Sequence, residues 1–104
     1  METAVVERRR HPRLLAEQSP WRQMRLRTGD PLVIVDIGGG GVLVESRRRL
    51  LPGTAVTVHL TGRDRAMSVE ARILRCAVCA LEPVGGVRYR GALEFCASGG
   101  EVVL

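Results

Sequence analysis

The sequence contains no lysine and few aromatic residues. Its 16 basic residues are all arginine, its acidic residues number 11, and the formal net charge is +5. Arginine grips a phosphate, or the O6/N7 edge of guanine, through two parallel hydrogen bonds that an ammonium group cannot make. A GC-rich genome would also favour arginine, so composition alone does not establish an anionic ligand. Because the chain has one Trp, one Tyr and one Phe, it offers little for bases to stack on, which argues against nucleic acid as the partner.

Long apolar runs, a disulfide pattern and a complete metal motif are also missing. No apolar stretch approaches the ~20 residues that cross a bilayer, and the first residues lack the apolar segment of a signal peptide. Three cysteines, an odd number, argue against a disulfide framework and fit a reducing compartment. Cys76 and Cys79 have the spacing of half a zinc site, but no second pair accompanies them. We expect a cytoplasmic protein with no membrane contact, metal or cofactor.

Catalytic groupings are absent as well. His11 and His59 have no evident partners for nucleophilic or acid–base chemistry. Neither a Ser/His/Asp set nor a pair of carboxylates stands out. We therefore expect a binding module with no catalytic residues, and not an enzyme.

The positive charge is concentrated near the N-terminus. Residues 8–27 contain seven arginines and one acid, Glu17, whereas residues 28–104 contain nine arginines and eight acids. An anionic partner is therefore expected at the N-terminal end and not over the whole surface.

Short alternating segments predict an all-β fold. A chain of 104 residues has room for one domain, and no convincing helix of about ten residues or more is present. The continuous apolar run Leu32–Val35 predicts a central strand buried on both faces. An antiparallel barrel or sandwich is the natural arrangement, and a barrel also removes exposed edges. We divide the chain into an N-terminal arm (residues 1–20), a barrel (21–96) and a tail (97–104). The expected strands cover residues 23–27, 32–35, 42–45, 54–60, 66–75 and 87–95.

Two segments contain the residues that we expect to bind a ligand. The first is the arm Arg8–Arg13, in which Arg9 and Arg13 can converge on one compact anion. The second is a predicted turn, Asp36–Gly41, whose four consecutive glycines permit positive φ and a close approach of a ligand to the backbone. Asp36 is placed to accept hydrogen bonds from a base edge such as guanine N1–H and N2–H₂.

In this order and spacing, the two segments resemble the PilZ family of bacterial cyclic di-GMP receptors. The family pattern is an Arg-x-x-x-Arg arm followed by Asp/Asn-x-Ser-x-x-Gly; here Arg9 and Arg13 match the arm, and Asp36 and Gly41 match the turn. The resemblance implies a six-stranded antiparallel β-barrel whose flexible arm wraps over the ligand. It also implies that the two motif arginines contact phosphate and guanine, and that the Asp36 turn holds a second guanine edge.

Arg8 precedes the motif, and in relatives an arginine there accompanies an intercalated ligand dimer, so the resemblance extends the site to Arg8.

Two departures from the family pattern leave alternatives open. Gly38 stands where the family usually has Ser, so one hydrogen bond to the ligand, worth about 0.5–1.5 kcal/mol, is lost unless backbone or water replaces it. The chain also ends soon after the last predicted strand, leaving little or no C-terminal helix. The leading interpretation is a cyclic di-GMP receptor or adaptor in bacterial second-messenger signalling, acting on an unidentified effector protein. The alternative is a degenerate PilZ-like interaction module that no longer binds the nucleotide.

Overall fold

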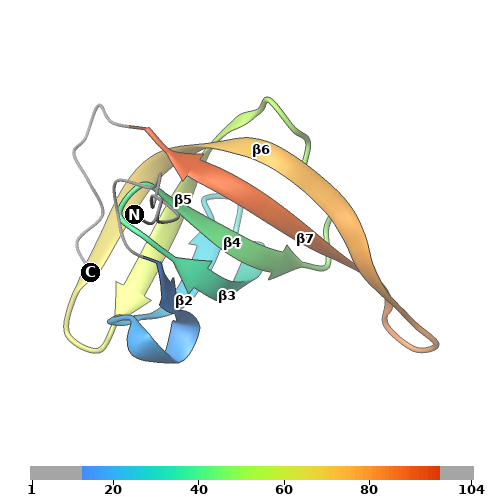
Figure 1. Ribbon diagram of the computed structural model, residues 1–104, viewed down its shortest axis with the longest axis horizontal. Coiled ribbons are helices and arrows are strands. Elements are labelled where there is room, and N and C mark those ends of the chain that lie inside the picture. The colour runs from blue at the N-terminus through green and yellow to red at the C-terminus, as the bar shows by residue number, and fades with distance from the viewer. Residues whose placement is uncertain (1–12, 97–104) are drawn as a thin grey trace, which may run out of the picture.

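The computed structural model describes residues 13–96, and almost all of their regular structure is β-strand (Figure 1). A single 3-10 turn, η1 (Ala16–Gln18), separates the first two strands. Arg8, Arg9 and the tail after Cys96 lie outside the described residues. No helix among residues 13–96 is long and apolar enough to cross a membrane. The strands are β1 (Leu14–Leu15), β2 (Trp21–Leu26), β3 (Pro31–Ile37), β4 (Gly41–Ser46), β5 (Ala55–Gly62), β6 (Ala66–Glu82) and β7 (Gly86–Phe95).

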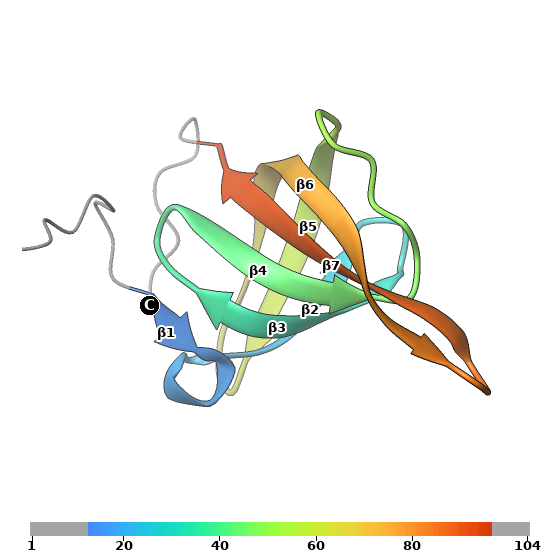
Figure 2. The same cartoon turned by 45° about the vertical axis from the view of Figure 1, so that its right-hand side comes forward.

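Strands β2 to β7 form a closed antiparallel barrel. The order along the sheet is β1-β3-β2-β5-β6-β7-β4, and an additional pairing of β3 with β4 closes the ring. Strand β1 lies outside this ring and pairs with the end of β3. The predicted six-stranded antiparallel barrel is therefore confirmed, and Figure 2 shows the strands curving around a common interior.

Aliphatic side chains and one tryptophan fill the interior. Along β6, Val69, Ala71 and Ile73 are buried, whereas the residues between them are exposed. This alternation follows from strand geometry, since successive side chains point to opposite faces. Trp21, only 2 % exposed, is among the largest buried side chains of the core.

The expectation that Leu32–Val35 is buried on both faces is wrong. Leu32 and Ile34 are buried, but Val33 is 63 % exposed. One face of each barrel strand looks inward and the other outward, so a continuous apolar run still buries only alternate residues.

The predicted turn at Asp36–Gly41 is shorter than expected. Asp36 and Ile37 belong to β3, because they pair with both β1 and β4. The hairpin between β3 and β4 is closed by a hydrogen bond from Gly38 N–H to the carbonyl oxygen of Gly41. Among the described residues, positive φ occurs at Gly29, Gly53, Gly85 and Gly86 and not in the Gly38–Gly41 run. The four glycines permit positive φ, but none of them adopts it.

Candidate functional site

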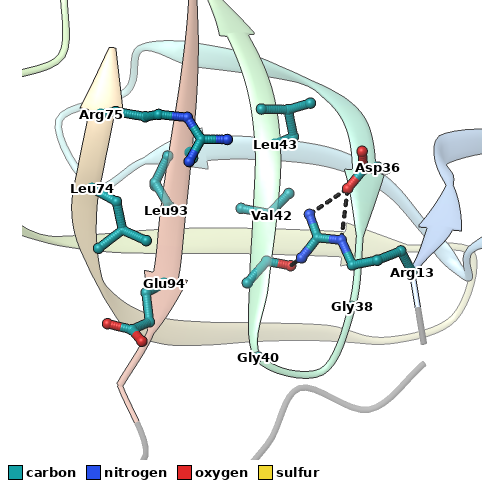
Figure 3. A pocket seen from close by; sticks show the side chains of 12 residues that line it. Arg13, Asp36, Gly38, Gly40, Val42, Leu43, Leu74, Arg75, Leu93 and Glu94 are labelled. Carbon is teal, nitrogen blue, oxygen red and sulfur yellow. Dashed lines mark hydrogen bonds and ion pairs between the residues drawn. The ribbon is translucent and has the colours of Figure 1, made fainter. Parts of the chain in front are cut away.

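The short strand β1 places Arg13 beside the end of β3. Leu14 pairs with Ile37, and Leu15 pairs with Asp36. Arg13 immediately precedes β1, so its side chain reaches across the end of the β3–β4 hairpin (Figure 3). Pairing over two residues is thus enough to join the N-terminal segment to the predicted turn.

The guanidinium of Arg13 binds both the Asp36 carboxylate and the hairpin backbone. Its Nε donates to Oδ1 of Asp36 at 2.8 Å, and one of its terminal nitrogens donates to the same oxygen. The other terminal nitrogen donates to the carbonyl oxygen of Gly41 at 3.1 Å. Both charged side chains remain about a quarter exposed, 25 % for Arg13 and 26 % for Asp36. Solvent and a ligand can therefore reach this ion pair.

Gly41 is required by close packing and not by its backbone conformation. A Cβ atom at this position would lie 2.6 Å from the carbonyl oxygen of Leu93 on β7. Gly41 pairs with Glu94, and the N–H of Phe95 donates to the carbonyl oxygen of Gly40 at 2.8 Å. The absence of a side chain lets the hairpin lie directly against β7.

A pocket of about 560 Å³ opens beside the ion pair, on the outer surface of β4, β7 and β6. This volume lies within the range of small-molecule sites. Arg13 and Asp36 line one side of the pocket, and Arg75 and Glu94 lie on the strands across it (Figure 3). The remaining lining consists of glycines of the hairpin and apolar groups, namely Gly38, Gly40, Gly41, Val42, Leu43, Leu74, Ala92 and Leu93.

A β-bulge brings two adjacent β6 residues to this pocket. The register between β6 and β7 shifts between Ile73 and Arg75, so Leu74 is the extra residue. Bulges of this kind re-aim side chains near sites. Sequence reasoning missed Leu74, Arg75 and Glu94 as lining residues, because their approach to the hairpin depends on strand pairings distant in sequence.

The described part of the pocket carries balanced charge. Arg13 and Arg75 contribute two positive charges, and Asp36 and Glu94 contribute two negative charges. An anionic ligand therefore needs further cations to be held strongly. The arginines of residues 8–10 are the nearest candidates along the chain.

The structure brings together four of the six predicted site residues: Arg13, Asp36, Gly38 and Gly41 all line this one pocket. Arg8 and Arg9 lie outside the described residues. Their contacts with a ligand, and those of the other four, stay predictions.

The residues considered for other chemistry lie elsewhere. A ring nitrogen of His59 is 2.6 Å from the hydroxyl of Ser68 on the neighbouring strand. Within residues 13–96, no cluster of three or more His, Cys, Asp or Glu side chains could hold a metal ion.

Comparison with known proteins identifies the family. The sequence matches the PilZ domain family over residues 7–94. Among solved structures, the fold is similar to the PilZ domain of YcgR from Escherichia coli, a structure containing c-di-GMP. The TM-score is 0.63 at 15 % sequence identity, with 88 % of this chain and 79 % of the other covered. The search of curated proteins gave no match. Since the family match spans most of the chain and the barrel agrees with it, this protein belongs to the PilZ domain family.

Proposed function

We propose that this PilZ domain is a receptor for cyclic di-GMP, which binds in the pocket beside the Arg13–Asp36 pair. The observation that carries the proposal is that residues from both halves of the family motif meet at one pocket. Arg13 from the arm lies on Asp36 and Gly41 from the hairpin. The ligand of the similar YcgR domain is c-di-GMP, which supports this choice of nucleotide.

Arg13 keeps hydrogen-bonding capacity for a ligand. A guanidinium has five N–H donors, and Arg13 uses three of them on Asp36 and Gly41. With respect to residues 13–96, two donors remain for a phosphate or a guanine edge. Asp36 accepts both of its bonds at Oδ1, so among the described residues Oδ2 is left to accept from guanine N1–H and N2–H₂.

The arm supplies the charge that the described pocket lacks. Because the charges of Arg13, Asp36, Arg75 and Glu94 balance, a doubly charged dinucleotide gains net attraction from Arg8 and Arg9. We propose that Arg9 contacts phosphate and guanine, that Arg8 favours an intercalated ligand dimer, and that the backbone of Gly38 and Gly41 permits close approach. Binding then draws the arm onto the barrel and changes the surface offered to an effector protein.

Isothermal titration with cyclic di-GMP tests this proposal. Wild-type protein should release or absorb heat with saturable binding, and Arg9→Ala and Arg13→Ala should each weaken it. A charged hydrogen bond is worth about 1.5–3 kcal/mol, so each loss should be about tenfold to a hundredfold. Arg49→Ala is the matched control, because Arg49 is exposed and follows the opposite end of β4. Unchanged affinity in both motif variants would contradict the proposed site.

A second candidate is a PilZ-like interaction module that has lost the nucleotide. Two observations favour it: Gly38 lacks the usual hydroxyl, and Arg13 is already held in an ion pair with Asp36, which a ligand would have to share. Gly38 has no positive φ, so its φ angle would not strain a serine at this position. If the wild-type protein gives no heat and Gly38→Ser binds, this second candidate is correct.

A further inference from the structure

A second pocket, of about 680 Å³, opens between strands β2 and β3. These strands pair only through Met24↔Leu32 and Arg25↔Pro31, and the far end of β3 pairs with β1 instead. Between these contacts the two strands separate, and we call the pocket that opens there the β2–β3 groove. The turn η1 lines one end of it, and the turn between β2 and β3 lines the other. None of its lining residues lines the nucleotide pocket.

The β3 side of the groove offers apolar surface and an unpaired strand edge. Val33 and Ile34 pair with β4, but no strand of residues 13–96 pairs with them on the side that faces β2. The edge of a strand is a template on which another extended chain can pair. Leu32 and Ile34 belong to the core and form the floor, whereas Val33 is 63 % exposed at the rim. This side therefore fits an extended polypeptide.

The β2 side of the groove supplies positive charge. Arg22 and Arg25 line it and are exposed. Arg22 donates to the carbonyl oxygen of Ser19 at 3.0 Å, but neither arginine forms an ion pair with a carboxylate of residues 13–96. The single acidic residue among the described lining residues is Glu17. The groove therefore has a surplus of positive charge, available to the carboxylates of a partner.

These two sides together discriminate among possible occupants. A two-fold contact between grooves of two copies would place Arg22 and Arg25 against the same arginines, so a second copy is disfavoured. A nucleic acid needs exposed rings for its bases to stack on, and Trp21, the sole Trp, Tyr or Phe among the described lining residues, is 2 % exposed. Neither a nucleic acid nor a lipid has the peptide groups that pair with a strand edge. An acidic polypeptide strand uses both sides.

We propose that the β2–β3 groove binds an extended segment of a partner protein in which acidic and apolar side chains alternate. The segment pairs with the free edge of β3, as in strand addition to other sheets. Because successive side chains of a strand point to opposite faces, its apolar side chains lie on the core residues of the floor. Its carboxylates face outward and bind Arg22 and Arg25. The proposal does not depend on nucleotide binding, because the two pockets share no lining residue.

Fluorescence anisotropy of a labelled hexapeptide of alternating valine and glutamate, without nucleotide, tests this site. Wild-type protein should bind it saturably. Arg25→Glu and, separately, Arg22→Glu should weaken binding by about tenfold or more, because each replaces a charged hydrogen bond with repulsion. Arg72→Glu is the matched control and should bind as the wild type does. Arg72 is also exposed and free of ion pairs with residues 13–96, but it lies on β6, outside the groove.

Two further peptides separate charge from strand pairing. A hexapeptide of alternating valine and lysine should not bind, because its charges repel the arginines. The valine–glutamate peptide with methylated backbone nitrogens should bind about tenfold more weakly, because it has lost the N–H donors that pair with β3. Equal binding of the methylated and unmethylated peptides would contradict strand addition. Circular dichroism of each protein variant separates a lost site from a lost fold.

Four other results would overturn the proposal. The wild-type protein could fail to bind the valine–glutamate peptide, or Arg25→Glu could bind it as tightly as the wild type. Arg72→Glu could lose as much affinity as Arg25→Glu, which would indicate attraction to the net charge alone. Finally, a thymidine oligonucleotide or phosphatidylglycerol vesicles could bind more tightly than the peptide and be lost with Arg25→Glu, or the peptide could bind only to protein shortened to residues 1–96. These last outcomes would assign the groove to a nucleic acid, to a membrane or to the chain's own tail.

Discussion

Replacing Gly41 with alanine is expected to destabilise the barrel. The new Cβ would lie 2.6 Å from the carbonyl oxygen of Leu93, where ordinary contact begins at 3.4 Å. The clashing atom belongs to the backbone of β7, so the hairpin must move as a unit and strain the pairing of Gly41 with Glu94.

Two opposing effects set the expected change in the free energy of unfolding of Gly41→Ala. Forcing an extra methyl group into a packed site costs about 1–3 kcal/mol. The gain from restricting the unfolded chain is about 0.4–1 kcal/mol, because φ at Gly41 is not positive and alanine can adopt it. The net free energy of unfolding should fall by about 1–2 kcal/mol, which lowers Tm by about 5–15 °C in a domain of this size.

Thermal unfolding followed by circular dichroism measures this change, with Gly91→Ala as the control. At Gly91 the nearest atom to a Cβ is the terminal Cδ1 of Leu50, at 2.8 Å, and a side-chain end can rotate away. The control should therefore lose less stability than Gly41→Ala. Equal Tm values for Gly41→Ala and the wild type, or a larger loss in the control, would refute this reasoning.

Three further predictions concern the pocket and the core. Gly38→Ser should tighten cyclic di-GMP binding by about tenfold, because a hydroxyl adds one hydrogen bond; titration of both proteins decides it. Arg75→Ala should weaken binding, more at low than at high ionic strength, because an exposed charge is screened by salt. The affinities of the wild-type and variant proteins are compared over a series of salt concentrations, and a loss of affinity that does not change with salt would contradict this prediction. Trp21→Ala should cost about 3–5 kcal/mol, since Trp21 is 2 % exposed; a denaturant midpoint close to that of the wild type would contradict this.

Much of the barrel could be predicted from local pattern. The alternation of Val69, Ala71 and Ile73 with polar residues identifies a strand with one buried face, and these residues are buried. Val58 and Leu60 are also both buried on one face of β5, as expected. An alternation of apolar and polar residues indicates which side chains of a strand are buried, because each strand has an inner and an outer face.

Features that depend on pairing between distant segments could not be predicted. The alternation of apolar and polar residues predicts a strand over residues 66–75. Strand β6 instead runs to Glu82, through residues 76–81, which are apolar without alternation. The bulge at Leu74 exists only relative to β7. For the same reason, Arg75 and Glu94 were not recognised beside the hairpin, whereas Arg13 and Asp36 were, through the family motif.

The most direct test of the account is calorimetric titration of cyclic di-GMP into the wild-type, Arg9→Ala and Arg13→Ala proteins. We expect saturable binding by the wild type and a loss of affinity of about tenfold to a hundredfold in each variant, as for removal of a charged hydrogen bond. No heat from the wild type at high micromolar protein, or the same affinity in all three proteins, would contradict the claim that the arginine arm and the Asp36 hairpin enclose the nucleotide.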